Sequence, residues 1–113
     1  MPKFITIGYG DRAGYDLTER GVRDAAHAAD AERVRQGDVM GIAGKPVQVR
    51  NHNATKVEVT EGAFLSAGLP VAGFALIEAS DLSAAIEIAA RSPCAVAQGV
   101  VDVWPLNPTE SET

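Results

Sequence analysis

Residues 71–89, VAGFALIEASDLSAAIEIA, combine a strand with a helix and decide the fold of the second half of the chain. Residues 71–78 are almost continuously apolar, which predicts a central strand that is covered on both faces. Ser80 or Asp81 then supplies a side-chain oxygen of the kind that caps a helix. Apolar residues follow at the spacing of one helix face and form the clearest helical pattern in the chain: Leu82, Ala85, Ile86 and Ala89.

Beyond this helix the sequence predicts one more strand. The residue before a proline is disfavoured in the helical conformation, so the helix should end near Arg91 or Ser92, ahead of Pro93. Residues 100–104, VVDVW, form the last predicted strand. We expect residues 1–106 to form a single domain. The tail, residues 107–113, carries no core-forming side chain and should be disordered or wrapped around a partner.

The stretch before residue 71 predicts a β-hairpin. Residues 47–49 (VQV) and 57–59 (VEV) alternate strictly, and the polar stretch NHNAT lies between them. An apolar connection without ionisable groups follows at residues 63–70. We expect it to be buried, with Phe64 and Leu65 pressed into the core or against a partner.

The first half of the chain has a strand, a helix and a strand in the same order. Residues 3–9 alternate as a strand, and residues 38–43 form the other. Between them, after a loop at residues 10–15, Asp16 or Thr18 can cap a helix that continues to the glycine before the second strand. The apolar stripe predicted for this helix consists of Val22, Ala25, Ala26 and Ala29.

The element order is therefore β-α-β, hairpin, β-α-β, which predicts an α+β fold of the ferredoxin-like type. In such a unit a mostly antiparallel sheet carries both helices on one face. The other sheet face would then be bare and apolar, and a second copy of the chain is the simplest cover for it. We expect a homodimer that forms through this open sheet face.

Composition excludes several classes of function. The 113 residues carry a net charge of −5, which argues against a nucleic-acid partner, and no apolar run is long enough for a membrane span. The single cysteine, Cys94, has no partner for an intramolecular disulfide, so a cytoplasmic location is the default expectation. The glycines at positions 8, 10 and 14 do not have dinucleotide-loop spacing, and the two histidines have no metal-site pattern, so no cofactor or metal is predicted.

The order and spacing of several short motifs resemble the YCII-related proteins, in particular the DGPF-domain branch. The matching stretches are Tyr9-Gly10-Asp11, GIAG at 41–44, VEVTEGAF at 57–64, GFALI at 73–77 and the helix that starts at Asp81. This resemblance implies a dimeric α+β barrel, in which two ferredoxin-like units pack sheet to sheet. It also implies an active-site pair of a first-helix histidine and an aspartate before a proline. His27 falls at the first position, but Ser92 replaces the aspartate.

His27 is the candidate catalytic residue. It lies off the apolar stripe of its helix, and Asp24 and Asp30 stand three residues away on either side, within reach of its N–H. The alternative is an ordinary boundary histidine that pairs with Asp30 on the surface. The candidate ligand-binding residues are Tyr9, Asp11, Asp30 and Ser92.

Two functions follow as hypotheses. The first is a homodimeric small-ligand-binding or accessory domain that performs no chemistry. The second is an enzyme in which His27 acts as general acid or base on a small molecule. The resemblance adds a third, an interaction module for a transcription-related partner.

Overall fold

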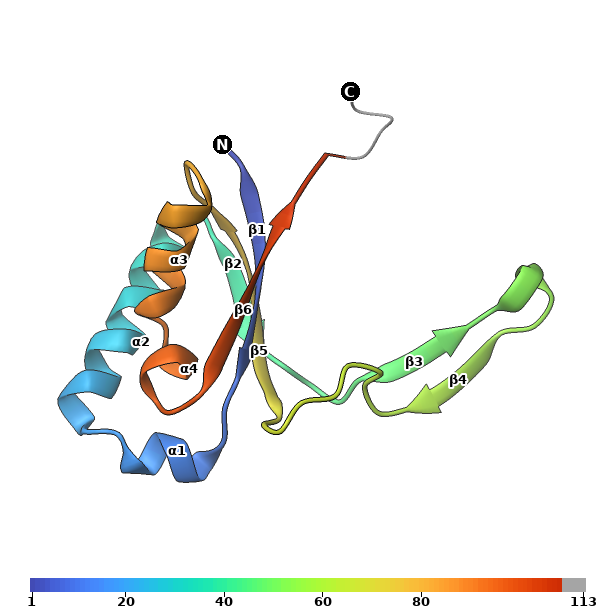
Figure 1. The fold of residues 1–113 in the computed structure, drawn as a ribbon, viewed down its shortest axis with the longest axis horizontal. Helices are drawn as coiled ribbons and strands as arrows, with labels where there is room; N and C mark the ends of the chain where they lie inside the picture. The colour runs from blue at the N-terminus through green and yellow to red at the C-terminus, as the bar shows by residue number, and fades with distance from the viewer. Residues whose placement is uncertain (109–113) are drawn as a thin grey trace.

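The computed structural model describes residues 1–108 and contains a four-stranded antiparallel sheet, helices on one of its faces and a separate hairpin (Figure 1). The strand order in the sheet is β2-β5-β1-β6. The strands are β1 (Lys3–Tyr9), β2 (Val39–Ile42), β3 (Val47–Arg50), β4 (Glu58–Glu61), β5 (Val71–Glu78) and β6 (Val100–Leu106). The helices are α1 (Arg12–Leu17), α2 (Arg20–Arg35), the 3-10 turn η1 (His52–Ala54), α3 (Leu82–Ala90) and α4 (Pro93–Val96).

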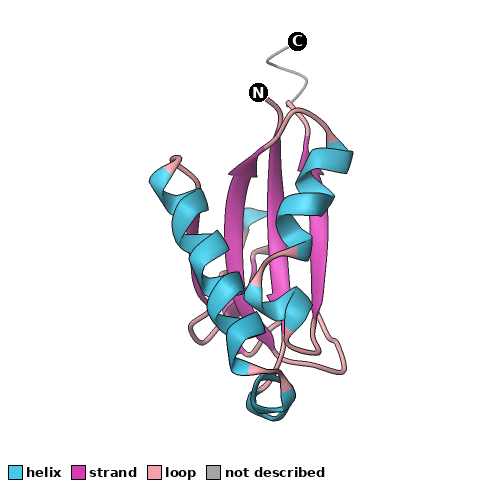
Figure 2. Ribbon diagram, turned by 90° about the vertical axis from the view of Figure 1, so that its left-hand side faces the viewer, coloured by secondary structure: helices cyan, strands magenta, loops and turns pink. Residues whose placement is uncertain are grey.

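Each strand–helix–strand unit is split by a strand of the other unit. Strand β5 lies between β1 and β2, and β1 lies between β5 and β6. The register places Phe4 opposite Ile77 on one side and opposite Pro105 on the other. The helices α1 to α4 all lie in front of the sheet when it is viewed from their side (Figure 2). The predicted α+β fold, with an antiparallel sheet and helices on one face, is confirmed.

The core between helices and sheet is small. Phe4 and Ile77 are almost fully buried and pack with Ala79 and with Ala85 of α3. Helix α3 begins as predicted at Asp81, whose carboxylate accepts a hydrogen bond from the backbone N–H of Ala84 at 2.8 Å. Alanines on the helices bring them close to the sheet but fill little volume between helix and sheet.

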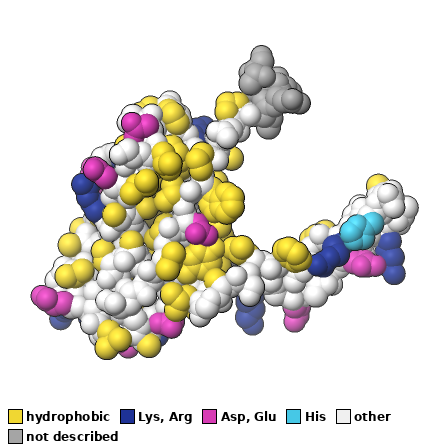
Figure 3. Space-filling view, in the orientation of Figure 1, with side chains coloured by type: hydrophobic (Ala, Val, Ile, Leu, Met, Phe, Trp, Pro, Cys, Tyr) yellow, Lys and Arg dark blue, Asp and Glu magenta, His cyan; other side chains and the backbone are white. Residues whose placement is uncertain are grey.

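The opposite sheet face is open to solvent. Phe74 and Trp104 are about half exposed, and the register puts Ile5, Ile7 and Leu76 on the same side. Hydrophobic side chains therefore gather over the side of the sheet that faces the hairpin (Figure 3). Within the single chain, the prediction that residues 71–78 are covered on both faces was wrong, because the four α-helices all lie on one side of the sheet.

Tyr9 and Asp102 form the polar contact of the open face. The Tyr9 hydroxyl donates to the Asp102 carboxylate at 2.8 Å, and Tyr9 itself is buried. Burial and the neighbouring carboxylate both raise the pKa of Tyr9. Tyr9 therefore hydrogen-bonds across the open face of the sheet and does not lie beside His27.

The first helical region differs from the prediction. Residues 12–17, expected to be mostly loop, form α1, and a break at Thr18 and Glu19 separates it from α2. The cap of α1 is Asp11, whose carboxylate accepts from the N–H of Gly14 at 2.8 Å; neither Asp16 nor Thr18 has this role. The Asp11-x-x-Gly14 spacing was the overlooked signal.

Both predicted helix stripes were partly wrong. In α2, Ala26 is buried, but Val22 and Ala25 are exposed, because the face toward the sheet runs through Arg23, Ala26, Asp30 and Arg33. In α3, Ala85 and Ala89 are buried while Leu82 and Ile86 are about half exposed. The inner faces therefore combine buried alanines with larger side chains, Asp30 and Arg33 in α2 and Ile88 in α3.

The predicted hairpin is confirmed as β3 paired with β4, but it stands apart from the main sheet (Figure 1). Phe64 is 83% exposed and Leu65 50% exposed, so the expectation that they enter the core of this chain was wrong. Strand β6 continues through Leu106, two residues beyond the predicted end. The rest of the predicted tail lies outside the described residues from position 109 onward. Within residues 1–108, no helix is both long and apolar enough to cross a membrane.

Candidate functional site

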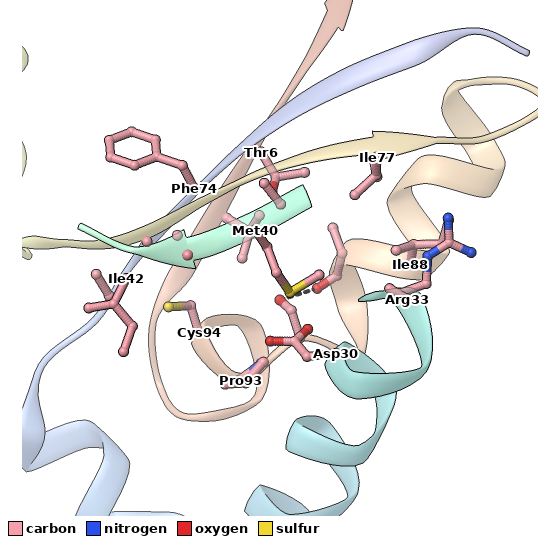
Figure 4. A pocket seen from close by; sticks show the side chains of 18 of the residues that line it. Thr6, Asp30, Arg33, Met40, Ile42, Phe74, Ile77, Ile88, Pro93 and Cys94 are labelled. Carbon is pink, nitrogen blue, oxygen red and sulfur yellow. Dashed lines mark hydrogen bonds between the residues drawn. The ribbon is translucent and has the colours of Figure 1, made fainter. Parts of the chain in front are cut away.

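A cavity of about 340 Å³ lies between α2, the inner sheet face and the α3–α4 corner (Figure 4). This volume is within the range of pockets that hold small molecules. The lining is mainly apolar, with Met40, Ile42 and Ile88 among its larger side chains. Its polar side chains come from β1, α2 and the turn before α4, and they are Thr6, His27, Asp30, Arg33 and Ser92.

Small residues on the strands make this space. The sheet floor is formed by Thr6, Gly8, Gly73 and Ala75, which face the helices in register. A side chain at Gly8 would bring its Cβ to 2.8 Å from the Cys94 sulfur. Gly8 therefore allows α4 to lie directly over β1, and the reading of this glycine as part of a dinucleotide loop is unnecessary.

Helix α2 is fixed over the cavity by an ion pair at its C-terminal end. The guanidinium of Arg33 donates to the Asp38 carboxylate at 2.6 Å and to the backbone carbonyl of Glu78 at 2.9 Å. Asp38 is buried, and its second oxygen accepts from the N–H of Glu78 at 3.2 Å. One carboxylate thus joins α2 to β5 and holds the wall that carries His27 and Asp30.

His27 is paired with Tyr15 rather than with either aspartate. Its Nε2 lies 3.0 Å from the Tyr15 hydroxyl, and the Arg23 guanidinium lies 4.6 Å from the centre of the Tyr15 ring. A second, more open hollow of about 630 Å³ shares His27 and Cys94 with this cavity and continues toward α1 past Asp11. His27 therefore stands where the two hollows meet.

Asp30 and Cys94 are titratable groups in the cavity wall whose environment changes their pKa. Burial raises the pKa of Asp30, although the nearby imidazole of His27 acts in the opposite direction. Burial also raises the pKa of the Cys94 thiol, and the Asp30 charge adds to this effect. Cys94 is consequently a neutral, weakly reactive thiol in the cavity wall.

Replacing Asp30 by asparagine should stabilise the protein at neutral pH. A carboxyl group whose folded-state pKa is raised stabilises the fold only while it is protonated, and this stabilisation is lost as the pH rises through the folded pKa. The gain from Asp30→Asn should therefore be present at pH 7 and disappear below the ordinary carboxyl value of 3.8. Urea unfolding at pH 7 and at pH 3 measures both. An equal effect at the two pH values would contradict this environment for Asp30.

The structure brings three of the predicted site residues together and leaves one apart. His27, Asp30 and Ser92 line the main cavity, and Asp11 lines the adjoining hollow with His27. The Ser92 hydroxyl donates to the carbonyl of Ala89 at 2.6 Å, so only its lone pairs are left for a ligand. Tyr9 is on the other face of the sheet.

Sequence reasoning missed several residues of the site. Tyr15 was expected in a loop. Its contact with His27 was not predicted, because a separation of twelve residues across a helix break gives no periodic signal. Met40 and Arg33 enter the cavity because β2 and the end of α2 lie beside each other, which only the tertiary fold determines (Figure 4).

The arrangement can hold a small molecule in a largely apolar space and present a few polar groups to one part of it. Among residues 1–108, no three His, Cys, Asp or Glu side chains come close enough to form a metal site. The sequence matches no protein-family model, and no curated protein is significantly similar to it, so the resemblance to YCII-related proteins stays a prediction.

Proposed function

We propose that the protein is a homodimeric domain that binds a small molecule in the cavity beneath α2. The observation that carries the proposal is the cavity itself, about 340 Å³ in volume and mainly apolar, with His27, Asp30 and Ser92 converging on it. A well-formed apolar pocket with a few convergent polar groups is the usual form of a small-ligand site.

The wall chemistry supports a particular kind of ligand. The Arg33 guanidinium already donates to the Asp38 carboxylate, and the Ser92 hydroxyl already donates to the carbonyl of Ala89. Asp30, by contrast, faces the apolar space with a raised pKa. We therefore propose a compact, mainly apolar molecule that presents an amine or a hydroxyl donor to Asp30.

The fold supports the proposed assembly. The order β2-β5-β1-β6, with the helices on one face, agrees with a ferredoxin-like unit, and the open apolar face agrees with a dimeric α+β barrel of the YCII-related kind. We propose membership of that family on the motifs and on this topology together. A second copy would cover Phe74 and Trp104, which are half exposed in the single chain.

Ligand preference can be tested with benzylamine, benzyl alcohol and benzoate, three probes of one size that end in a cation, a neutral donor and an anion. NMR titration of the protein should show binding in the order benzylamine, benzyl alcohol, benzoate. Asp30→Asn should remove the preference for the amine, because the carboxylate that attracts the cation is gone.

The matched control fills the cavity and leaves its charges in place. Met40 points into the space (Figure 4), and Met40→Phe should weaken all three probes alike. Shifts that occur only outside the cavity-lining residues, or that Met40→Phe leaves unchanged, would contradict the proposed site.

A second candidate function is acid–base catalysis by His27. The observation that favours it is the position of His27 between the two hollows, with Tyr15 as an orienting partner at 3.0 Å from Nε2. An imidazole held by a second side chain is the usual arrangement of a general base. With any substrate found among cavity ligands, His27→Asn should lower kcat at least a hundredfold and leave binding nearly unchanged. Unchanged turnover would exclude this role.

A further inference from the structure

The β3–β4 hairpin has a valine face that no other part of residues 1–108 covers. We call residues 47–61 the arm. Val49 lies opposite Val59 in the hairpin register, and Val47 is on the same face of β3. These three valines are between 57% and 64% exposed, and Val57, just before β4, is 63% exposed.

An arm of this kind is not stable by itself in water. A two-stranded hairpin needs a further strand or a packed apolar face for stability, and here the arm projects away from the main sheet (Figure 1). Its opposite face is polar, with Gln48 accepting from Arg50 at 2.9 Å. The arm is therefore amphipathic, and its apolar side requires a partner surface.

The single chain is more extended and exposes more surface than a compact monomer of its length. The radius of gyration is 16.2 Å, whereas a compact domain of this length has about 13 Å. The accessible surface is 8016 Å², whereas a compact monomer of 11.8 kDa exposes roughly 5,900 Å². The excess of about 2,000 Å² per chain equals the share that each subunit contributes to a large obligate homodimer.

The direction of the arm identifies a second copy as the occupant. The arm leaves the body on the side of the open sheet face, so a copy that packs on that face lies alongside it (Figures 1 and 3).

We propose that the arm crosses to a second copy of this chain and packs its valine face against it, so that the arm of each subunit contacts the other subunit. This inference rests on the homodimer proposed above. It goes further by assigning the arm a role in holding the dimer, in addition to contact between the two sheets. A two-fold axis makes the contact reciprocal, since each copy gives one arm and receives one.

The test compares aspartate substitutions on the valine face of the arm with aspartate substitutions on its polar face. Val49→Asp and Val59→Asp alter the valine face, and Gln48→Asp and Thr60→Asp are the neighbouring controls on the polar face. Sedimentation equilibrium should show the dimer dissociation constant rising at least tenfold for the two valine variants and less than threefold for the controls. Hydrogen exchange of the arm amides in the wild-type protein should slow as the protein concentration rises through the dimerisation range.

The outcomes separate the arm from the dimer itself. A wild-type protein that is monomeric at 100 μM would overturn both the homodimer and the arm contact. A wild-type dimer whose dissociation constant responds equally to all four substitutions, or to none, would overturn the arm contact alone. Arm amides that exchange at one rate at every concentration would do the same, whatever the fold of the valine variants.

Discussion

Replacing Phe74 by glutamate is expected to raise the dissociation constant of the homodimer at least a hundredfold. Phe74 is 51% exposed in the single chain, and its ring points away from the cavity, on the open side of the sheet (Figure 4). In a two-fold dimer of sheets, both new carboxylates would enter the apolar contact, where neither finds a cation. A hundredfold change corresponds to about 2.7 kcal/mol, which is modest for burying unpaired charges. Sedimentation equilibrium at micromolar concentration measures it.

Ile86→Glu is the matched control for this change. Ile86 is 53% exposed, almost the same as Phe74, but it lies on the outer face of α3, across the helix layer from the open sheet. Its replacement should leave the dimer intact. If Ile86→Glu dissociates the dimer and Phe74→Glu does not, the subunits meet through their helices, and the open sheet face needs another explanation.

The order of strands and helices was predictable because it follows from local patterns. The apolar run at residues 71–78, the aspartate cap at Asp81 and the alternating valines of the hairpin each report a single element. Where these patterns failed, a contact distant in sequence decided the outcome. Val22 and Leu82 are almost half exposed because the tertiary fold turns Ala26 of α2 and Ala85 of α3 toward the sheet instead.

The candidate site could be predicted only in part, for a similar reason. His27, Asp30 and Ser92 were named from sequence and do line one cavity. The partner of His27 was not predicted. Tyr15 contacts His27 because the chain breaks between α1 and α2, and no periodic pattern in the sequence indicates this break. Tyr9 was named as a ligand-binding residue, but strand alternation directs it to Asp102 on the open face, away from the cavity.

The second large effect should come from Asp38, the buried carboxylate that fixes α2. Asp38→Ala should lower the free energy of unfolding by about 3 kcal/mol, because it leaves the Arg33 charge, whose side chain is only 21% exposed, without its partner at 2.6 Å. The N–H of Glu78 loses an acceptor as well. For a domain of this size the loss corresponds to roughly 10–20 °C in Tm, measured at one fixed protein concentration because dimerisation also contributes.

Asp24→Ala supplies the comparison, since Asp24 also pairs with an arginine of α2 but does so at 3.8 Å from Arg20 and in solvent. It should cost no more than about 0.5 kcal/mol. Equal losses from the two substitutions would mean that burial of the Asp38–Arg33 pair adds nothing to the stability of the protein.

The Asp38–Arg33 pair should also affect ligand binding, since it holds α2, which carries His27 and Asp30 over the cavity. Asp38→Asn keeps an acceptor for Glu78 but removes the charge opposite Arg33. It should therefore weaken benzylamine binding less than Asp38→Ala does, although neither residue 38 variant alters a side chain that lines the cavity.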